Sequence, residues 1–131
     1  MPSLPRTNGT INKRLLGSRH EKYACRYLKR RGFKQVTSNY SCRLGEIDLV
    51  MLDAANTLVF IEVRFRKNDR FGSALDTVDF AKQGRVRRTA ASFLQAHSSF
   101  KHHSCRFDVI AITSNPDSNN PLINWVKNAF Y

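Results

Sequence analysis

The sequence predicts a mixed α/β domain, in which one β-sheet has both antiparallel and parallel neighbours and packs against helices. Two observations lead to this fold class. The apolar residues switch between helical and strand-like spacing in the order α-β-β-β-α-β-β. The two clearest strands flank the short turn-like segment 53–56 and should pair as an antiparallel hairpin, whereas a later strand–helix–strand step allows a parallel crossover.

The elements of the first third follow from helical periodicity and a glycine stop signal. Residues 1–12 are rich in Pro, Gly, Ser, Thr and Asn and are predicted to form a flexible arm. The 3–4 spacing of apolar residues predicts a helix over 13–31, and Gly32 is placed to end it in a left-handed conformation. Alternation predicts a short strand over 33–37, followed by a polar connection over 39–43.

The remaining elements are two long strands, a second helix and two further strands. Apolar alternation predicts the strands, and the helix combines an apolar stripe with a basic opposite face. The predicted segments are strands 45–52 and 57–66, an exposed loop 67–74, a helix 77–96, a strand 105–112, a turn-rich loop 115–121 and a short strand near 123–126.

Length and composition indicate one soluble domain over residues 13–131. The chain has 131 residues, of which 41% are hydrophobic and 24% charged. No apolar run approaches the roughly 18 residues of a membrane span, and the N-terminus lacks the apolar region of a secretory signal. Three widely spaced cysteines suggest neither a zinc site nor a disulfide framework, so we expect a cytoplasmic protein.

The net charge of +12 is informative about partners. A surface this basic favours a polyanion, with nucleic acid first and an anionic membrane second. The membrane is the weaker candidate, because no basic amphipathic helix with a Trp, Phe and Leu face stands out. A soluble protein that is merely basic stays open on charge alone.

Three acidic residues interrupt strands that should be core. Glu46 and Asp48 lie in the strand 45–52, and Glu62 lies in the strand 57–66, although the chain has only ten acids in all. A buried carboxylate is costly unless it is paired, hydrogen-bonded or bound to a cation. Alternation places Glu46, Asp48 and Val50 on one face, with Ile47, Leu49 and Met51 on the other.

The hairpin register brings the acids together. A loop at 54–56 sets Val50 opposite Phe60, which puts Asp48 opposite Glu62 and Glu46 opposite Arg64. Two carboxylates so close repel each other unless a proton or a metal lies between them. Oxygen ligands without imidazole or thiolate favour Mg²⁺ or Mn²⁺, which phosphodiester hydrolysis uses. The alternative is a solvent-exposed hairpin end with a Glu46–Arg64 ion pair.

An ordered set of motifs resembles the bacterial YraN family. The motifs are Gly45-Glu46-Ile47-Asp48-Leu49-Val50, Val59-Phe60-Ile61-Glu62-Val63-Arg64-Phe65-Arg66, Phe71-Gly72 and Lys82-Gln83. The resemblance covers roughly residues 17–128. It implies a restriction endonuclease-like core, a mixed β-sheet flanked by α-helices, as in nucleases of the PD-(D/E)XK superfamily and Holliday junction resolvases.

The resemblance also implies roles for individual residues. Asp48 and Glu62 match the motif acids and would bind Mg²⁺ or Mn²⁺. Glu21 matches the first-helix glutamate that supports the metal site in resolvase-like relatives, with a solvated helical charge as its alternative. Glu46 is expected to act next to the metal ligands. Four basic residues are expected to hold the nucleic-acid backbone, namely Arg43, Arg66, Lys82 and Arg85.

Arg64 departs from the superfamily pattern, which usually has lysine there. Arginine stays protonated in proteins, so Arg64 cannot be a general base, but it can clamp a phosphate or stabilise the transition state. Two functions follow. The first is a Mg²⁺-dependent endonuclease of branched or structured DNA, plausibly homodimeric by analogy with resolvases. The second is a non-catalytic nucleic-acid-binding module on a nuclease scaffold.

Asp108 is the remaining acid in an apolar strand. It interrupts the strand 105–112, and a structural pairing with Arg106 or another cation is its expected role.

Overall fold

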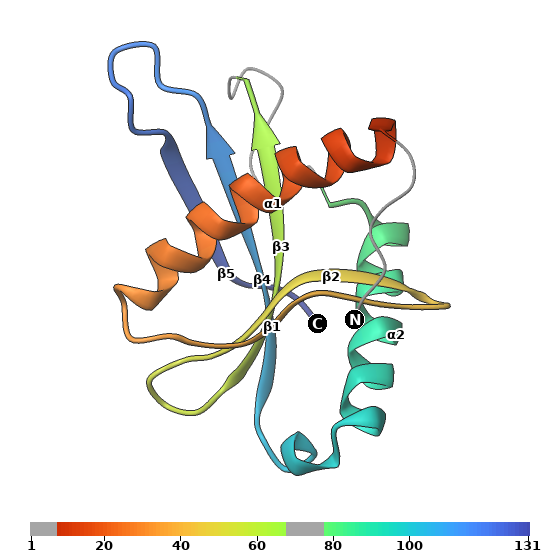
Figure 1. Cartoon of the computed structure of the whole chain (residues 1–131). Coiled ribbons are helices and arrows are strands. Elements are labelled where there is room, and N and C mark those ends of the chain that lie inside the picture. Colours follow the sequence, from red (N-terminus) through yellow and green to blue (C-terminus); the bar gives the residue numbers. More distant parts are fainter. Residues whose placement is uncertain (1–7, 68–77) are drawn as a thin grey trace, which may run out of the picture.

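A five-stranded β-sheet with a helix packed on each face makes up the described part of the protein (Figure 1). The computed structural model describes residues 8–67 and 78–131. The elements in chain order are α1 (Asn8–Lys29), β1 (Lys34–Cys42), β2 (Gly45–Leu52), β3 (Leu58–Arg66), α2 (Phe80–Ala96), the 3-10 helix η2 (Ser98–Phe100), β4 (Cys105–Thr113) and β5 (Leu122–Phe130).

The sheet is mixed, as the element order predicts. Its strands lie in the order β1-β2-β3-β4-β5. Strands β3 and β4 are parallel and are connected through α2, whereas the other three neighbouring pairs are antiparallel. The predicted element order and the mixed α/β sheet flanked by helices are therefore confirmed, whereas the restriction endonuclease-like core stays a prediction. No helix within the described ranges is long and apolar enough to span a membrane.

Each face of the sheet carries its own apolar core. On the α2 side, the ring of Phe93 packs edge-on against Phe60 of β3, with ring centroids 5.9 Å apart. On the α1 side, Leu28 packs with Val59 and Ile61 of the same strand. Because β3 is buried on both faces, it reads as a continuous apolar run until Glu62 interrupts it.

Three predicted boundaries differ from the structure. Helix α1 begins at Asn8, so residues 8–12 of the predicted arm are helical. Strand β1 continues to Cys42, because a tight turn lets the polar segment 39–42 pair with β2. Helix α2 begins at Phe80, since the Asp79 carboxylate accepts the Lys82 N–H at 2.8 Å and caps it.

Other parts of the prediction agree or cannot be compared. Gly32 has φ +90° and follows the end of α1, as predicted. Strand β5 runs from Leu122 to Phe130 and is longer than the predicted 123–126. Residues 1–7, most of the predicted loop 67–74 and the motif Phe71-Gly72 lie outside the described residues.

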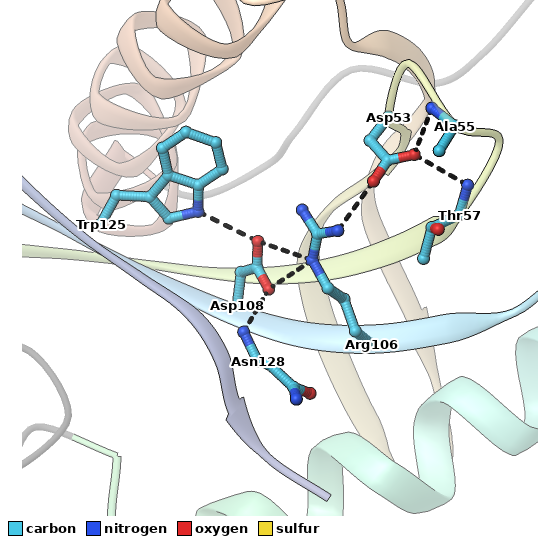
Figure 2. Close-up of polar contacts among 7 residues, drawn as sticks. All are labelled: Asp53, Ala55, Thr57, Arg106, Asp108, Trp125 and Asn128. Atoms are coloured by element: carbon cyan, nitrogen blue, oxygen red, sulfur yellow. Dashed lines mark hydrogen bonds and ion pairs between the residues drawn. The ribbon is translucent and has the colours of Figure 1, made fainter.

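A buried aspartate ties β4 to β5 and to the β2–β3 turn (Figure 2). The fully buried carboxylate of Asp108 accepts hydrogen bonds from Arg106 Nε at 3.1 Å, Trp125 Nε1 at 3.0 Å and the Asn128 N–H at 2.9 Å. Arg106 also donates to Asp53 at 2.7 Å. The predicted structural pairing of Asp108 with Arg106 is confirmed.

Replacing this aspartate should destabilise the fold. Asp108→Asn removes the negative charge that balances Arg106 and turns one acceptor into a donor that faces other donors. We expect a loss of about 3 kcal/mol in the free energy of unfolding, measured by urea denaturation. Asp117→Asn on an exposed loop is the control and should stay within about 0.5 kcal/mol of wild type. Equal stability of the two variants would contradict this account of the network.

Candidate metal and nucleic-acid site

The backbone pairing of strands β2 and β3 stops before it reaches Asp48. The predicted pairing of Val50 with Phe60 is confirmed, but the ladder ends one residue later, at Leu49 and Ile61. Beyond this point the Asp48 Oδ2 atom accepts the Val63 N–H at 2.8 Å, in place of a backbone carbonyl of β2. The predicted opposition of Asp48 to Glu62 and of Glu46 to Arg64 is therefore not formed as strand pairing.

The regular alternation of β2 also breaks at Asp48. Ile47 and Leu49 should share a face, yet Ile47 packs in the core beside α2 and Leu49 in the core beside α1. On β1, Asn39 lies between the two residues that pair with them and has a left-handed φ of +53°. Asparagine tolerates this conformation better than most residues. The predicted faces of β2 are thus wrong on the N-terminal side of Leu49.

Two acids from other elements lie beside Asp48 at this break. Glu21 comes from α1, Asp48 from β2 and Glu62 from β3. The Glu62 side chain is only 3% exposed. Glu21 is hydrogen-bonded to Asp48 and to Asn39. Two carboxylates share a hydrogen bond only when one is protonated, so below its raised pKa of about 7 Glu21 can donate a proton to this bond with Asp48.

Burial and mutual repulsion make these acids hard to ionise. Burial, followed by the charge of Asp48, raises the pKa of Glu62 to about 7. Burial, followed by the charge of Asp48 and the hydrogen bond between them, raises the pKa of Glu21 to about 7. Burial also raises the pKa of Asp48, against the opposing effect of the Val63 N–H. A cation placed among them would relieve this unfavourable electrostatic energy.

Two basic side chains lie next to Glu62 but leave part of its hydrogen-bonding capacity unused. Lys82 Nζ of α2 lies 3.6 Å and Arg64 Nη2 lies 3.8 Å from the same oxygen, Glu62 Oε2. Tight charge-assisted hydrogen bonds measure about 2.7–2.9 Å, so both ion pairs are loose. The other oxygen, Glu62 Oε1, is buried without a hydrogen-bond partner, and so are Glu21 Oε1 and Arg64 Nε.

The donor set fits a hard divalent cation held by few protein ligands. Within the described residues, no three His, Cys, Asp or Glu side chains surround one point. Mg²⁺ commonly takes one or two carboxylates and keeps its remaining positions for water and phosphate. Asp48 and the unpartnered Glu62 Oε1 meet that requirement. Glu21 as a third ligand stays a prediction, because its hydrogen bonds go to Asp48 and Asn39.

The other predicted site residues surround the tip of the β1–β2 hairpin and the end of β3. Glu46, Lys82 and Arg85 line one cleft of about 360 Å³ with Ser41, Cys42 and Gly45. Gly45 lets the hairpin approach α2, because a Cβ there would lie 2.9 Å from Thr89 Oγ1. Arg43 is exposed in the turn after β1, and Arg66 is half-buried at the end of β3.

A second cleft, between α1 and β1, was not predicted. It measures about 260 Å³ and begins at Glu21. Basic side chains of α1, polar side chains of β1 and two apolar residues line the rest of it, namely Lys22, Cys25, Arg26, Lys29, Gln35, Ser38, Asn39 and Leu49. The helical spacing of the basic residues was visible in the sequence, but β1 was expected to end before Ser38 and Asn39.

Comparison with known proteins identifies relatives along most of the chain. The model of the uncharacterised protein family UPF0102 matches residues 20–112. A UPF0102 protein of Pseudomonas syringae is 45% identical over 87% of this chain and 91% of its own length. Relatives from Nitrosococcus oceani and Stutzerimonas stutzeri are 46% and 45% identical over the same share of this chain and 90% and 92% of theirs.

A more distant likeness exists among solved structures. A repair endonuclease from Pyrococcus abyssi superposes with a TM-score of 0.41 and 15% identity, over 88% of this chain. The chain spans 42% of the length of that endonuclease. A superposition this weak carries no argument about function, which has to be derived from the site itself.

The raised pKa of Glu62 predicts a stability that falls as pH rises. Between its unfolded value of 4.5 and about 7, the folded protein holds a proton that the unfolded chain releases, so the stabilisation is complete below pH 4.5 and is lost as pH rises. Denaturation in a buffer that contains EDTA, at pH 5 to 8, measures the free energy of unfolding. Relative to wild type, the free energy of unfolding of Glu62→Gln should rise by on the order of 2 kcal/mol between pH 5 and 8.

The exposed Glu46 provides the matched control for that measurement. Glu46→Gln makes the same chemical change on the neighbouring strand, and its stability should run parallel to that of wild type. A Glu62→Gln curve that also runs parallel to wild type would show that Glu62 ionises normally in the folded protein.

Proposed function

The chain belongs to the uncharacterised protein family UPF0102, the YraN family that its motifs predict, and on this premise we propose that it is a Mg²⁺- or Mn²⁺-dependent endonuclease acting on DNA. The observation that carries the proposal is the pair of acids Asp48 and Glu62. They lie on adjacent strands at the point where those strands separate, and one carboxylate oxygen of Glu62 has no partner. Clustered acids with perturbed pKa values are characteristic of catalytic sites.

In the proposed site, Asp48 and Glu62 hold the metal ion. Such an ion supplies a Lewis acid that neutralises charge on the phosphate and makes a bound water a better nucleophile. The Val63 N–H binds Asp48 Oδ2 and so fixes the direction of this carboxylate. Glu21 adds a carboxyl group beside Asp48, and a cation bound there would favour its ionised form.

The two cations beside Glu62 take different parts. Arg64 binds a phosphate oxygen of the substrate, because its guanidinium cannot release a proton. Lys82 approaches the same carboxylate from α2 and presents a compact ammonium group. We assign to Lys82 the place of the lysine that Arg64 replaces on β3, which is to position the attacking water and the phosphate beside Glu62.

The charge of the chain directs the site towards nucleic acid. A net charge of +12 favours a polyanion, and Asp48 and Glu62 lie where a metal ion would offset their charge. Arg43, Arg66 and Arg85 hold the backbone in this proposal, together with Lys82. Branched or otherwise structured DNA is the proposed substrate, and a homodimer would supply the paired sites that a branched substrate needs.

Loss of Asp48 should abolish cleavage. Plasmid, single-stranded and four-way-junction DNA are incubated with Mg²⁺ or Mn²⁺, and the products are resolved on gels. Asp48→Asn should cut at least about 100-fold more slowly, because it removes a proposed ligand. Asp117→Asn, on an exposed loop, should cut as wild type does. Equal cutting by the Asp48 variant would place the activity elsewhere or in a contaminant.

Two charge-preserving exchanges test the division of labour between the cations. Lys82→Arg keeps the positive charge but replaces the compact ammonium group with a larger planar guanidinium, so cleavage should fall by about 10²-fold or more while DNA binding persists. Arg64→Lys should retain cleavage. Full activity of Lys82→Arg would show that Lys82 does not position the attacking water.

A non-catalytic nucleic-acid-binding module is the second candidate. The observation that favours it is the double ion pair of Glu62, which leaves that acid partly neutralised without any metal. This candidate is selected if wild type binds DNA in a salt-dependent way but neither it nor Arg64→Lys cuts any of the substrates. Metal-dependent cutting by wild type, lost in Asp48→Asn, rejects it.

A further inference from the structure

The cleft between α1 and β1 carries three cations without an acidic partner among the residues that the structure describes. Lys22, Arg26 and Lys29 are all exposed and line the cleft from the helix side. Within the described ranges, no carboxylate lies within ion-pair distance of any of them. Surface cations of a folded protein are usually solvated, so their charge alone says little. Because all three cations line the same cleft, the cleft should prefer an anionic ligand.

The opposite wall of the cleft offers neutral polar groups. Gln35, Ser38 and Asn39 of β1 line it, and Gln35 Oε1 accepts a weak hydrogen bond from Cys25 Sγ at the base of the helix. Amide and hydroxyl side chains are common partners of phosphate and sugar oxygens. A hollow with cations on one wall and neutral donors on the other matches a chain of phosphates better than an apolar or cationic ligand.

The spacing of the cations matches a nucleic-acid strand. An α-helix rises 1.5 Å per residue, so the three side chains span roughly 10 Å along α1. One strand of a duplex advances about 3.4 Å per nucleotide, so this length corresponds to about three nucleotide steps. The volume of about 260 Å³ is small for a ligand pocket, so the cleft receives one strand and not a whole duplex.

The cleft leads to the acidic site. Glu21 and Asn39 are among its lining residues, and Glu21 is hydrogen-bonded both to Asn39 and to Asp48. A phosphate backbone held by the three cations would therefore continue towards the place where the proposed metal lies. The cleft with Lys82 and Arg85 lies towards α2, whereas this one lies towards α1.

We propose that the cleft between α1 and β1 is the track for one strand of the substrate, in which Lys22, Arg26 and Lys29 each contact a backbone phosphate on one side of the cleavage site. The inference rests on the proposed action on nucleic acid and names the surface that holds it. The recognised group is the phosphodiester backbone, so the track binds without regard to base sequence.

Salt dependence of binding tests the track without requiring cleavage. The affinity for a fluorescent single strand and for a duplex is measured in EDTA between 50 and 200 mM salt. Each lost phosphate contact should lower the slope of log K against log salt by about 0.7 for a single strand and about 0.9 for a duplex. The slope of the triple variant Lys22→Gln, Arg26→Gln, Lys29→Gln should therefore fall by about 2 for the single strand and by about 2.7 for the duplex. The variant should also bind at least tenfold more weakly at low salt.

A charge-matched variant separates the track from the overall charge. Arg88→Gln, Lys101→Gln and Lys127→Gln remove the same three charges from exposed positions that do not line the cleft, and their slope should stay close to wild type. The single variant Arg26→Gln should lose one contact. Equal slopes for the two triple variants, or no DNA binding by wild type, would overturn the proposal.

The same measurements distinguish this inference from the proposed activity. If wild type never cuts DNA but the cleft variant loses the expected slope, the track stands and the endonuclease proposal fails. If wild type cuts in a metal-dependent way but the cleft variant binds and cuts like wild type, the activity stands and the track is rejected.

Discussion

The hydrogen bond from the Val63 N–H to the Asp48 carboxylate is the interaction on which the site depends. A buried backbone N–H needs an acceptor, and in a continuous sheet β2 would supply one from its own backbone. The side chain supplies it instead, so β2 can leave β3 without orphaning the donor. The space that opens contains Glu62 on the next strand, and the same bond fixes the direction of Asp48 towards it. The same hydrogen bond therefore allows the two strands to separate and holds Asp48 beside Glu62.

Asp108 and Asp48 show how a fully paired acid differs from one in an incomplete group. Asp108 receives hydrogen bonds from Arg106, Trp125 and Asn128 on both its oxygens, and the resulting network is complete. The group around Asp48 is incomplete, because its neighbours Glu21 and Glu62 each keep a buried oxygen without a partner. Unsatisfied buried polar atoms are rare in folded proteins, and where they persist they point to a missing ligand or ion.

Much of the framework follows from sequence, because it depends on local periodicity. Alternation located β2 and β3, and the turn between them fixed the pairing of Val50 with Phe60. The prediction failed where tertiary contacts override alternation. The kink at Asn39 and the change of faces beside Asp48 allow Ile47 and Leu49 to enter different cores, and no short-range pattern encodes that choice.

The same limit applied to the site. Asp48 and Glu62 were found because acids in apolar strands are conspicuous, and their proximity survived even though the predicted ladder did not. The track residues of α1 were missed because a basic helical face is ordinarily solvated. Its partner wall was also hidden, since β1 continues past residue 37 only by pairing with β2. A cleft made by two elements cannot be predicted when one of them is assigned to a loop.

The electrostatics of the site and of the surface depend on each other. Burial raises the pKa of all three neighbouring carboxylates, and Lys82 and Arg64 act against that rise by lowering the pKa of Glu62. Their contacts are long, so they favour ionisation without closing the site to a metal ion. An anionic strand that approaches such a site first contacts the cations. The acids bind the strand only where a divalent ion bridges them to a phosphate. A basic protein with few acids is therefore well suited to bring metal and substrate to the same few carboxylates.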